Sequence, residues 1–301
     1  MSVFDAYGLA IAGTGAVVGG ACAFIGCFLI LRKMAMLGDA ISHSVLLGIV
    51  LAFLLTGDRG IVTMFVGAAV FGLLTAVMVQ ALEGSGVASD AAIGVTFTSF
   101  FALGVVLLTA FAGRVHLDLE HVLYGEIAYV PWDLLIVGET VLGPRALWTM
   151  GAVFALNLIV IGLFYKEFKL CAFDPGMAAA LGINVALFHY LQMGLVSVTT
   201  VAAFESVGAI LSVAMLIVPG ATAYLLTEDL RKLLALSVFF GAASSVGGYA
   251  VAYLIDCSIA GAMAGVSGVY FLLAFLFSPS QGVLTKRLAR RFGQAGQSVV
   301  Q

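Results

Sequence analysis

Charged side chains are scarce in this chain of 301 residues: they make up 10% of it, whereas 62% of the residues are hydrophobic. A soluble domain is roughly one-quarter charged and about half apolar, so the composition excludes an ordinary soluble protein. The net charge is only -3, and no basic tract is long enough to predict binding to nucleic acid. The sequence therefore predicts an integral membrane protein with several spans.

Cysteine is also rare, with four residues and no Cys-x-x-Cys pair, which favours packing roles over a metal centre or a disulfide. No Walker A sequence occurs, so any use of ATP would depend on another polypeptide. Proline is rare as well (5 residues), whereas glycine is abundant (36 residues). Small residues let helices pack closely in lipid, so these counts are typical of a tightly packed bundle of membrane helices.

Apolar runs of about 20 residues, the length that crosses a bilayer, predict an all-α polytopic helix bundle. The run 185–227 is long enough for two helices, and we expect it to break near 203–208, around Glu205. This gives nine spans, and eight remain an alternative because tilted segments are easily miscounted. The expected spans are 7–31, 34–56, 60–82, 91–112, 146–165, two within 185–227, 233–254 and 260–277.

The basic residues predict the orientation, because they gather on the cytoplasmic side of membrane proteins. Of the 13 lysines and arginines, three fall on one side of the nine spans, at Arg59, Arg114 and Arg145, and the others fall on the opposite side. The N-terminus is then outside and the C-terminus inside. We expect one transmembrane domain, 1–285, followed by a cytoplasmic tail, 286–301.

Asp39 and His43 stand four residues apart in the apolar stretch 36–53, so they share one face of a helix. A carboxylate and an imidazole suit manganese, iron or zinc, and a charge inside a membrane usually faces a cavity or a partner. Alternatively, Asp39 caps the start of the second span and His43 is a satisfied buried histidine. Spacing alone leaves both interpretations open.

Further carboxylates and histidines are expected on the outer side. Glu205 lies at the expected break between two spans, where it either caps a helix start, favoured by the helix dipole, or stands on an ion path. The polar stretch 113–145 contains His116, Asp118 and His121. These three side chains could meet an arriving cation or a docking protein, or they could belong to a solvated loop with interfacial aromatic residues.

A short helix is predicted on the cytoplasmic side, over 174–182. Asp174 followed by Pro175 is a typical helix start, and Gly182 is a typical helix end. A plain connector would need only a few turn residues, whereas this segment has an alanine-rich face, which includes Ala179. Small side chains allow another protein to approach closely, so the segment predicts a contact with a partner.

Three stretches, in this order, resemble the permease subunits of manganese/zinc/iron ABC importers: MLGDAISHSVLLGIVLAF (36–53), FDPGMAAALGI (173–183) and FESVGAILSVAMLIVPGATAYLLT (204–227). The resemblance extends over nearly the whole chain. It implies a fold similar to type II ABC importers, in a bacterial inner membrane. It also implies three kinds of partner, namely a second permease subunit (identical or related), cytoplasmic ATPases and an extracytoplasmic metal-binding protein.

The same resemblance implies roles for particular residues. Asp39 and His43 would meet the transported ion, and the helix 174–182 would be the contact for the ATPase. The chain would carry manganese, zinc or iron as cargo, with no resident cofactor and no enzymatic activity of its own. Glu205 occurs in a subset that resembles manganese and iron permeases and favours manganese, since oxygen ligands suit harder ions. The alternatives are a permease for a metal chelate and a proton-coupled metal carrier.

Overall fold

The computed structural model describes residues 6–57, 61–111, 127–137, 140–278 and 282. Within these ranges, nine helices are long and apolar enough to cross a membrane, which confirms the all-α polytopic fold and favours nine spans over eight. The nine are α1 (Ala6–Leu31), α2 (Met36–Thr56), α3 (Ile61–Gly84), α4 (Ser89–Phe111), α6 (Arg145–Leu163), α9 (Val185–Val207), α10 (Ala209–Leu226), α11 (Leu230–Ile255) and α12 (Ile259–Phe277). The predicted tail, 286–301, lies outside the described residues.

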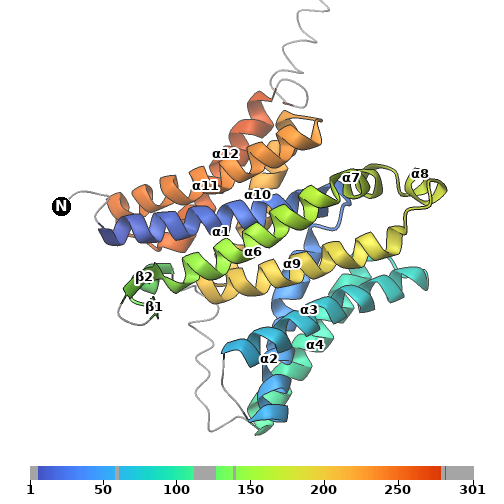
Figure 1. The fold of residues 1–301 in the computed structure, drawn as a ribbon, viewed down its shortest axis with the longest axis horizontal. Coiled ribbons are helices and arrows are strands. Elements are labelled where there is room, and N and C mark those ends of the chain that lie inside the picture. Colours follow the sequence, from blue (N-terminus) through green and yellow to red (C-terminus); the bar gives the residue numbers. More distant parts are fainter. Residues whose placement is uncertain (1–5, 58–60, 112–126, 138–139, 279–281, 283–301) are drawn as a thin grey trace, which may run out of the picture.

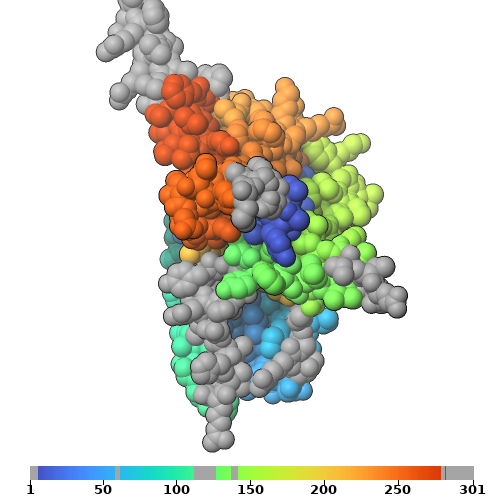
Figure 2. All heavy atoms as spheres, turned by 90° about the vertical axis from the view of Figure 1, so that its left-hand side faces the viewer, coloured from blue at the N-terminus to red at the C-terminus, as the bar shows by residue number. Residues whose placement is uncertain are grey.

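The long helices form two groups, and α1 lies within the larger one. Figure 1 shows α2, α3 and α4 together below the other helices, with α2 running across the direction of α1 and α9. In the view from the N-terminal end of α1, α11 and α12 lie above α1, and the α2–α4 group lies below it (Figure 2). The face between the α2–α4 group and the larger group is therefore a natural place for a site.

Close packing of small residues explains the central position of α1. A Cβ atom added at Gly19 would lie 2.6 Å from the carbonyl oxygen of Gly241 on α11, so only glycine allows the two backbones to approach this closely. The hydroxyl of Ser245 donates a hydrogen bond to the carbonyl of Gly15, 2.7 Å away. Contacts of this kind replace the hydrophobic driving force between helices in lipid.

The long run 185–227 breaks where the sequence predicts. Helix α9 ends at Val207, Gly208 adopts a φ of 81°, and α10 begins at Ala209. A positive φ is accessible to glycine at little cost, so this residue can separate two helices without a longer loop.

The connector before α9 contains more structure than expected. It holds two helices, α7 (Tyr165–Phe173) and α8 (Pro175–Ala180), where the sequence predicts only the second one. The two lie at the right-hand end of the molecule in Figure 1. Helix α6 ends at Leu163, so the fifth predicted span, 146–165, is about two residues too long at its end.

The stretch 113–145 is only partly described and contains a few short elements. These are the 3-10 helix η1 (Ile127–Tyr129) and an antiparallel pair of strands, β1 (Leu134–Val137) and β2 (Thr140–Pro144). The ring of Trp132 stacks on that of Tyr7 on α1, with ring centres 6.0 Å apart. This contact places the hairpin at the end of the bundle where α1 starts, as Figure 1 shows.

Candidate functional site

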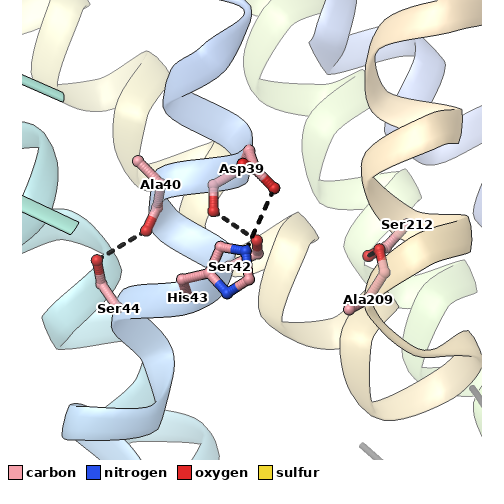
Figure 3. Close-up of polar contacts among 7 residues, drawn as sticks. All are labelled: Asp39, Ala40, Ser42, His43, Ser44, Ala209 and Ser212. Carbon is pink, nitrogen blue, oxygen red and sulfur yellow. Dashed lines mark hydrogen bonds and ion pairs between the residues drawn. The ribbon is translucent and has the colours of Figure 1, made fainter. Parts of the chain in front are cut away.

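Asp39 and His43 lie on the same face of α2, near its start. The Oδ1 atom of Asp39 and the Nε2 atom of His43 are 3.6 Å apart, and the two side chains are 35% and 34% exposed. This separation is longer than a hydrogen bond. The residue at the N-cap of α2 is Ala35, which makes no side-chain cap bond, so the alternative that Asp39 caps this helix is wrong. Figure 3 shows both side chains on the side of α2 that faces α10.

The neighbouring serines of α2 bond to the backbone of their own helix. The hydroxyl of Ser42 donates to the carbonyl of Asp39 at 2.6 Å, and that of Ser44 donates to the carbonyl of Ala40 at 2.7 Å (Figure 3). Each hydroxyl hydrogen is therefore already donated to the backbone. Ser42 can offer only the lone pairs of its oxygen to a bound ion. Its small side chain also leaves room beside Asp39 and His43.

A cavity of about 460 Å³ lies between α2 and α10. Asp39, Ser42 and His43 form its α2 wall, and the α10 wall consists of aliphatic residues between Ala209 and Val218. Among the lining residues, all the polar side chains come from α2. A cation in this cavity would meet one carboxylate, one imidazole and one serine hydroxyl oxygen, on an otherwise apolar surface.

The start of α2 lies beside the middle of α10. The backbone of Gly38 packs against the side chain of Leu216, and a Cβ atom added there would also lie 3.7 Å from Leu29 on α1. Leu216 is near the midpoint of Ala209–Leu226. Because α10 is one of the helices long and apolar enough to cross a membrane, the start of α2 lies beside the middle of a candidate span.

Aromatic residues of α4 hold the His43 ring from the other side. The ring centres of Phe97 and Phe101 are each 5.7 Å from that of His43. Packing against two rings restricts the rotation of the imidazole and keeps it on the side of Asp39. The sequence gives no signal for this contact, because both phenylalanines belong to an apolar helix with many others.

Glu205 does not join this site. It lies in the last turn of α9, is exposed, and is absent from the cavity lining. It therefore does not start a helix, and the alternative that it caps one is wrong; the N-cap of α10 is Gly208. Its charged neighbours are Arg145 and Asp133, beside the hairpin.

The described residues contain no group of three or more histidine, cysteine, aspartate or glutamate side chains close enough to hold a metal ion. Asp39 and His43 alone would therefore be an incomplete ligand set, because transition metals take four to six ligands. Water, substrate-side groups or another subunit would have to supply the rest. His116, Asp118 and His121 lie outside the described residues.

Helix α8 is built as the sequence predicts. The carboxylate of Asp174 accepts a hydrogen bond from the backbone N–H of Met177 at 2.9 Å, Pro175 is the first helical residue, and Gly182 has a φ of 81°. Ala178 is buried, whereas Ala179 is exposed. The exposed face also carries Met177, which is 54% exposed, so α8 offers a small apolar surface outside the bundle.

The chain is similar to several known proteins. The model of a family described as "ABC 3 transport family" matches residues 9–278. The manganese transport system membrane protein MntD of Bacillus subtilis is 58% identical over 275 residues, which cover 91% of this chain and 93% of that protein. The zinc transport system membrane protein TroD of Treponema pallidum is 45% identical over 276 residues, covering 91% and 75%. Among solved structures, PsaBC from Streptococcus pneumoniae in complex with Fab has 37% identity and a TM-score of 0.76, covering 93% and 95%.

Proposed function

Because the chain belongs to the ABC 3 transport family, we propose that it is the membrane-spanning permease subunit of an ABC importer that carries a divalent transition-metal ion into the cytoplasm. The family resemblance that the three sequence stretches predict is confirmed. The relatives MntD and TroD are named as membrane proteins of manganese and zinc transport systems, which supports a bare metal ion as the cargo. Manganese is the first ion to test, since MntD is the more similar of the two.

The observation that carries the proposal is the Asp39–His43 pair at the wall of the cavity between α2 and α10. An isolated carboxylate is costly in an apolar layer, and here it stands with an imidazole, a pair of ligands that transition metals accept. The opposite wall, on α10, offers no ligand. The cation would therefore be held by one side only, which favours brief binding and release over storage.

The distribution of polar groups in the cavity supports an ion over a metal chelate. A chelate is a bulky organic ligand that needs a wide pocket with aromatic or hydrogen-bonding walls. The α10 wall is formed by small and aliphatic side chains, and the polar groups are confined to α2. A bare ion with a few remaining waters suits this lining better.

The proposed transporter includes partner subunits. A cytoplasmic ATPase would bind the exposed surface of α8, a second permease subunit would complete the metal path, and an extracytoplasmic protein would deliver the ion. The N-terminus would lie outside and the C-terminus in the cytoplasm. A carrier that works alone and uses a proton gradient would have no use for an exposed, well-capped helix such as α8.

Metal accumulation in cells that depend on this transporter tests the proposal. We expect Asp39→Asn and His43→Gln to lower manganese uptake at least about tenfold, because each removes a charge or a ligand from the pair. Ser44→Ala is the matched control, since Ser44 lies on the same helix and its hydroxyl bonds only to the backbone. Equal amounts of each variant in the membrane must be verified. Unchanged uptake in both site variants would exclude this role for the pair.

A further inference from the structure

A polar contact in the interior joins α9 to the segment just before α2. The Nη1 atom of Arg32 donates a hydrogen bond to Oε1 of Gln192, 3.2 Å away. Gln192 is 2% exposed and His189, one turn earlier on α9, is 5% exposed. Side-chain nitrogens of both residues are buried and have no partner within the described part of the chain. Burying such groups is costly, so packing alone does not account for polar residues here.

On one side, this contact leads to α8. Helix α9 starts at Val185, with only four residues between it and the end of α8, and Asn184 caps it by accepting a hydrogen bond from the N–H of Leu187 at 3.1 Å. The connection is itself bonded back to α8, because the N–H of Ile183 donates to the carbonyl of Ala178 at 3.0 Å. A displacement of α8 would therefore be carried directly into the first turns of α9.

Aromatic packing makes the same region rigid. The ring of Phe188 on α9 lies against Phe168 on α7, with ring centres 5.3 Å apart, and Phe168 in turn lies 5.8 Å from Phe28 on α1. The three helices α7, α9 and α1 are thus packed together next to α8. Gln192 stands one turn beyond Phe188 on the same helix.

On the other side, the contact leads to the Asp39–His43 pair. Arg32 is the first residue after α1, and the short link 32–35 to α2 is held by backbone hydrogen bonds, such as the one from the N–H of Met34 to the carbonyl of Leu29 at 2.8 Å. Lys33 takes a φ of 60°, which fixes a sharp change of direction. Asp39 follows in the first turn of α2. A shift of Arg32 would therefore move the start of α2.

We propose that Arg32 and Gln192 are positioning residues that transmit the movement of α8 to the metal-binding face of α2; the inference rests on the proposed function. Coupling between distant sites travels through packed elements and hydrogen-bond networks with two arrangements. The Arg32–Gln192 contact joins two segments that are far apart in sequence, one attached to the ATPase contact and the other to the cation pair. Neither residue lines the cavity.

The ratio of metal ions transported to ATP molecules hydrolysed separates this role from a merely structural one. The assay uses the full transporter in proteoliposomes, with its ATPase, the second permease subunit and a manganese-loaded binding protein. We expect Gln192→Leu, which removes the acceptor, to lower the ratio at least about fivefold, the lower end of typical coupling between sites. Gln192→Glu keeps an acceptor for Arg32, and we expect it to stay within about twofold of wild type.

Two further variants complete the experiment. Lys33→Gln removes a neighbouring positive charge from the same link and should leave the ratio unchanged. Arg32→Gln breaks the same contact from its less buried side and should lower the ratio as Gln192→Leu does. It therefore still tests the contact if Gln192→Leu fails to assemble. An unchanged ratio in both contact-breaking variants would overturn the inference, even if total activity fell. Absence of ATP-driven manganese uptake by the wild-type transporter would instead overturn the proposed function.

Discussion

Leu216 touches two glycines in different ways, and this difference predicts unequal effects of the same substitution. A methyl group at Gly26 on α1 would overlap the backbone carbonyl of Leu216, whereas one at Gly38 on α2 would overlap only the tip of its side chain. Alanine in place of glycine stabilises a helix by about 1 kcal/mol, and overpacking a core costs about 1–3 kcal/mol. For Gly38→Ala the net loss is therefore about 0–2 kcal/mol.

Gly26→Ala should be more damaging, because a main-chain atom does not rotate away. Helices α1 and α10 would have to separate along their buried faces, and we expect a net loss of at least about 2 kcal/mol, the upper end for overpacking less the helical gain. The assay is the midpoint of thermal unfolding of the purified protein in detergent. Gly13→Ala on the same helix is the control, since nothing lies within 4 Å of the added methyl. Equal midpoints for Gly26→Ala and Gly13→Ala would refute the close approach of α1 and α10.

Two other predictions concern the cap of α8 and the reactivity of two cysteines. Asp174→Ala removes the cap of α8 and should destabilise this helix by about 1 kcal/mol, which would lower the amount of ATPase that co-purifies; Asp229→Ala, which uncaps α11, should leave co-purification unchanged. Burial raises the pKa of the Cys171 thiol, and the thiolate is the reactive form. Maleimide should therefore label the exposed Cys257 at neutral pH. Cys171 should react only when the pH rises above the ordinary pKa of a thiol. Equal labelling rates of the two cysteines at neutral pH would contradict the burial of Cys171.

Local chemistry explains which parts of the fold were predictable. The break at Gly208 and the ends of α8 depend on single residues whose backbone preferences are strong, namely a glycine with positive φ, an aspartate cap and a proline at the first helical position. The spans follow from apolar length alone. Helix α7 was missed because it carries lysines and a glutamate among its apolar residues, a mixture that resembles a polar connector.

The site was predictable only in part, because its depth and its opposite wall depend on tertiary packing. Periodicity places Asp39 and His43 on one face of α2, but only the contact of Gly38 with Leu216 shows that this face lies beside the middle of α10. Position in the sequence likewise suggests that Glu205 could start a helix, whereas the structure places it in the last turn of α9 and not among the residues that line the cavity.

The one-sided distribution of ligands has a consequence for transport. An ion must bind well enough to enter a path and weakly enough to leave it, and a complete shell of four to six protein ligands would retain a transition metal. In the proposed site α2 would supply two ligands, whereas the α10 wall is apolar, so affinity would depend on what else faces Asp39 and His43 at a given moment. A second subunit or remaining waters could complete the shell in one state and leave in the next. A small displacement of α2, such as the Arg32–Gln192 contact would transmit, could then change affinity without altering the ligands themselves.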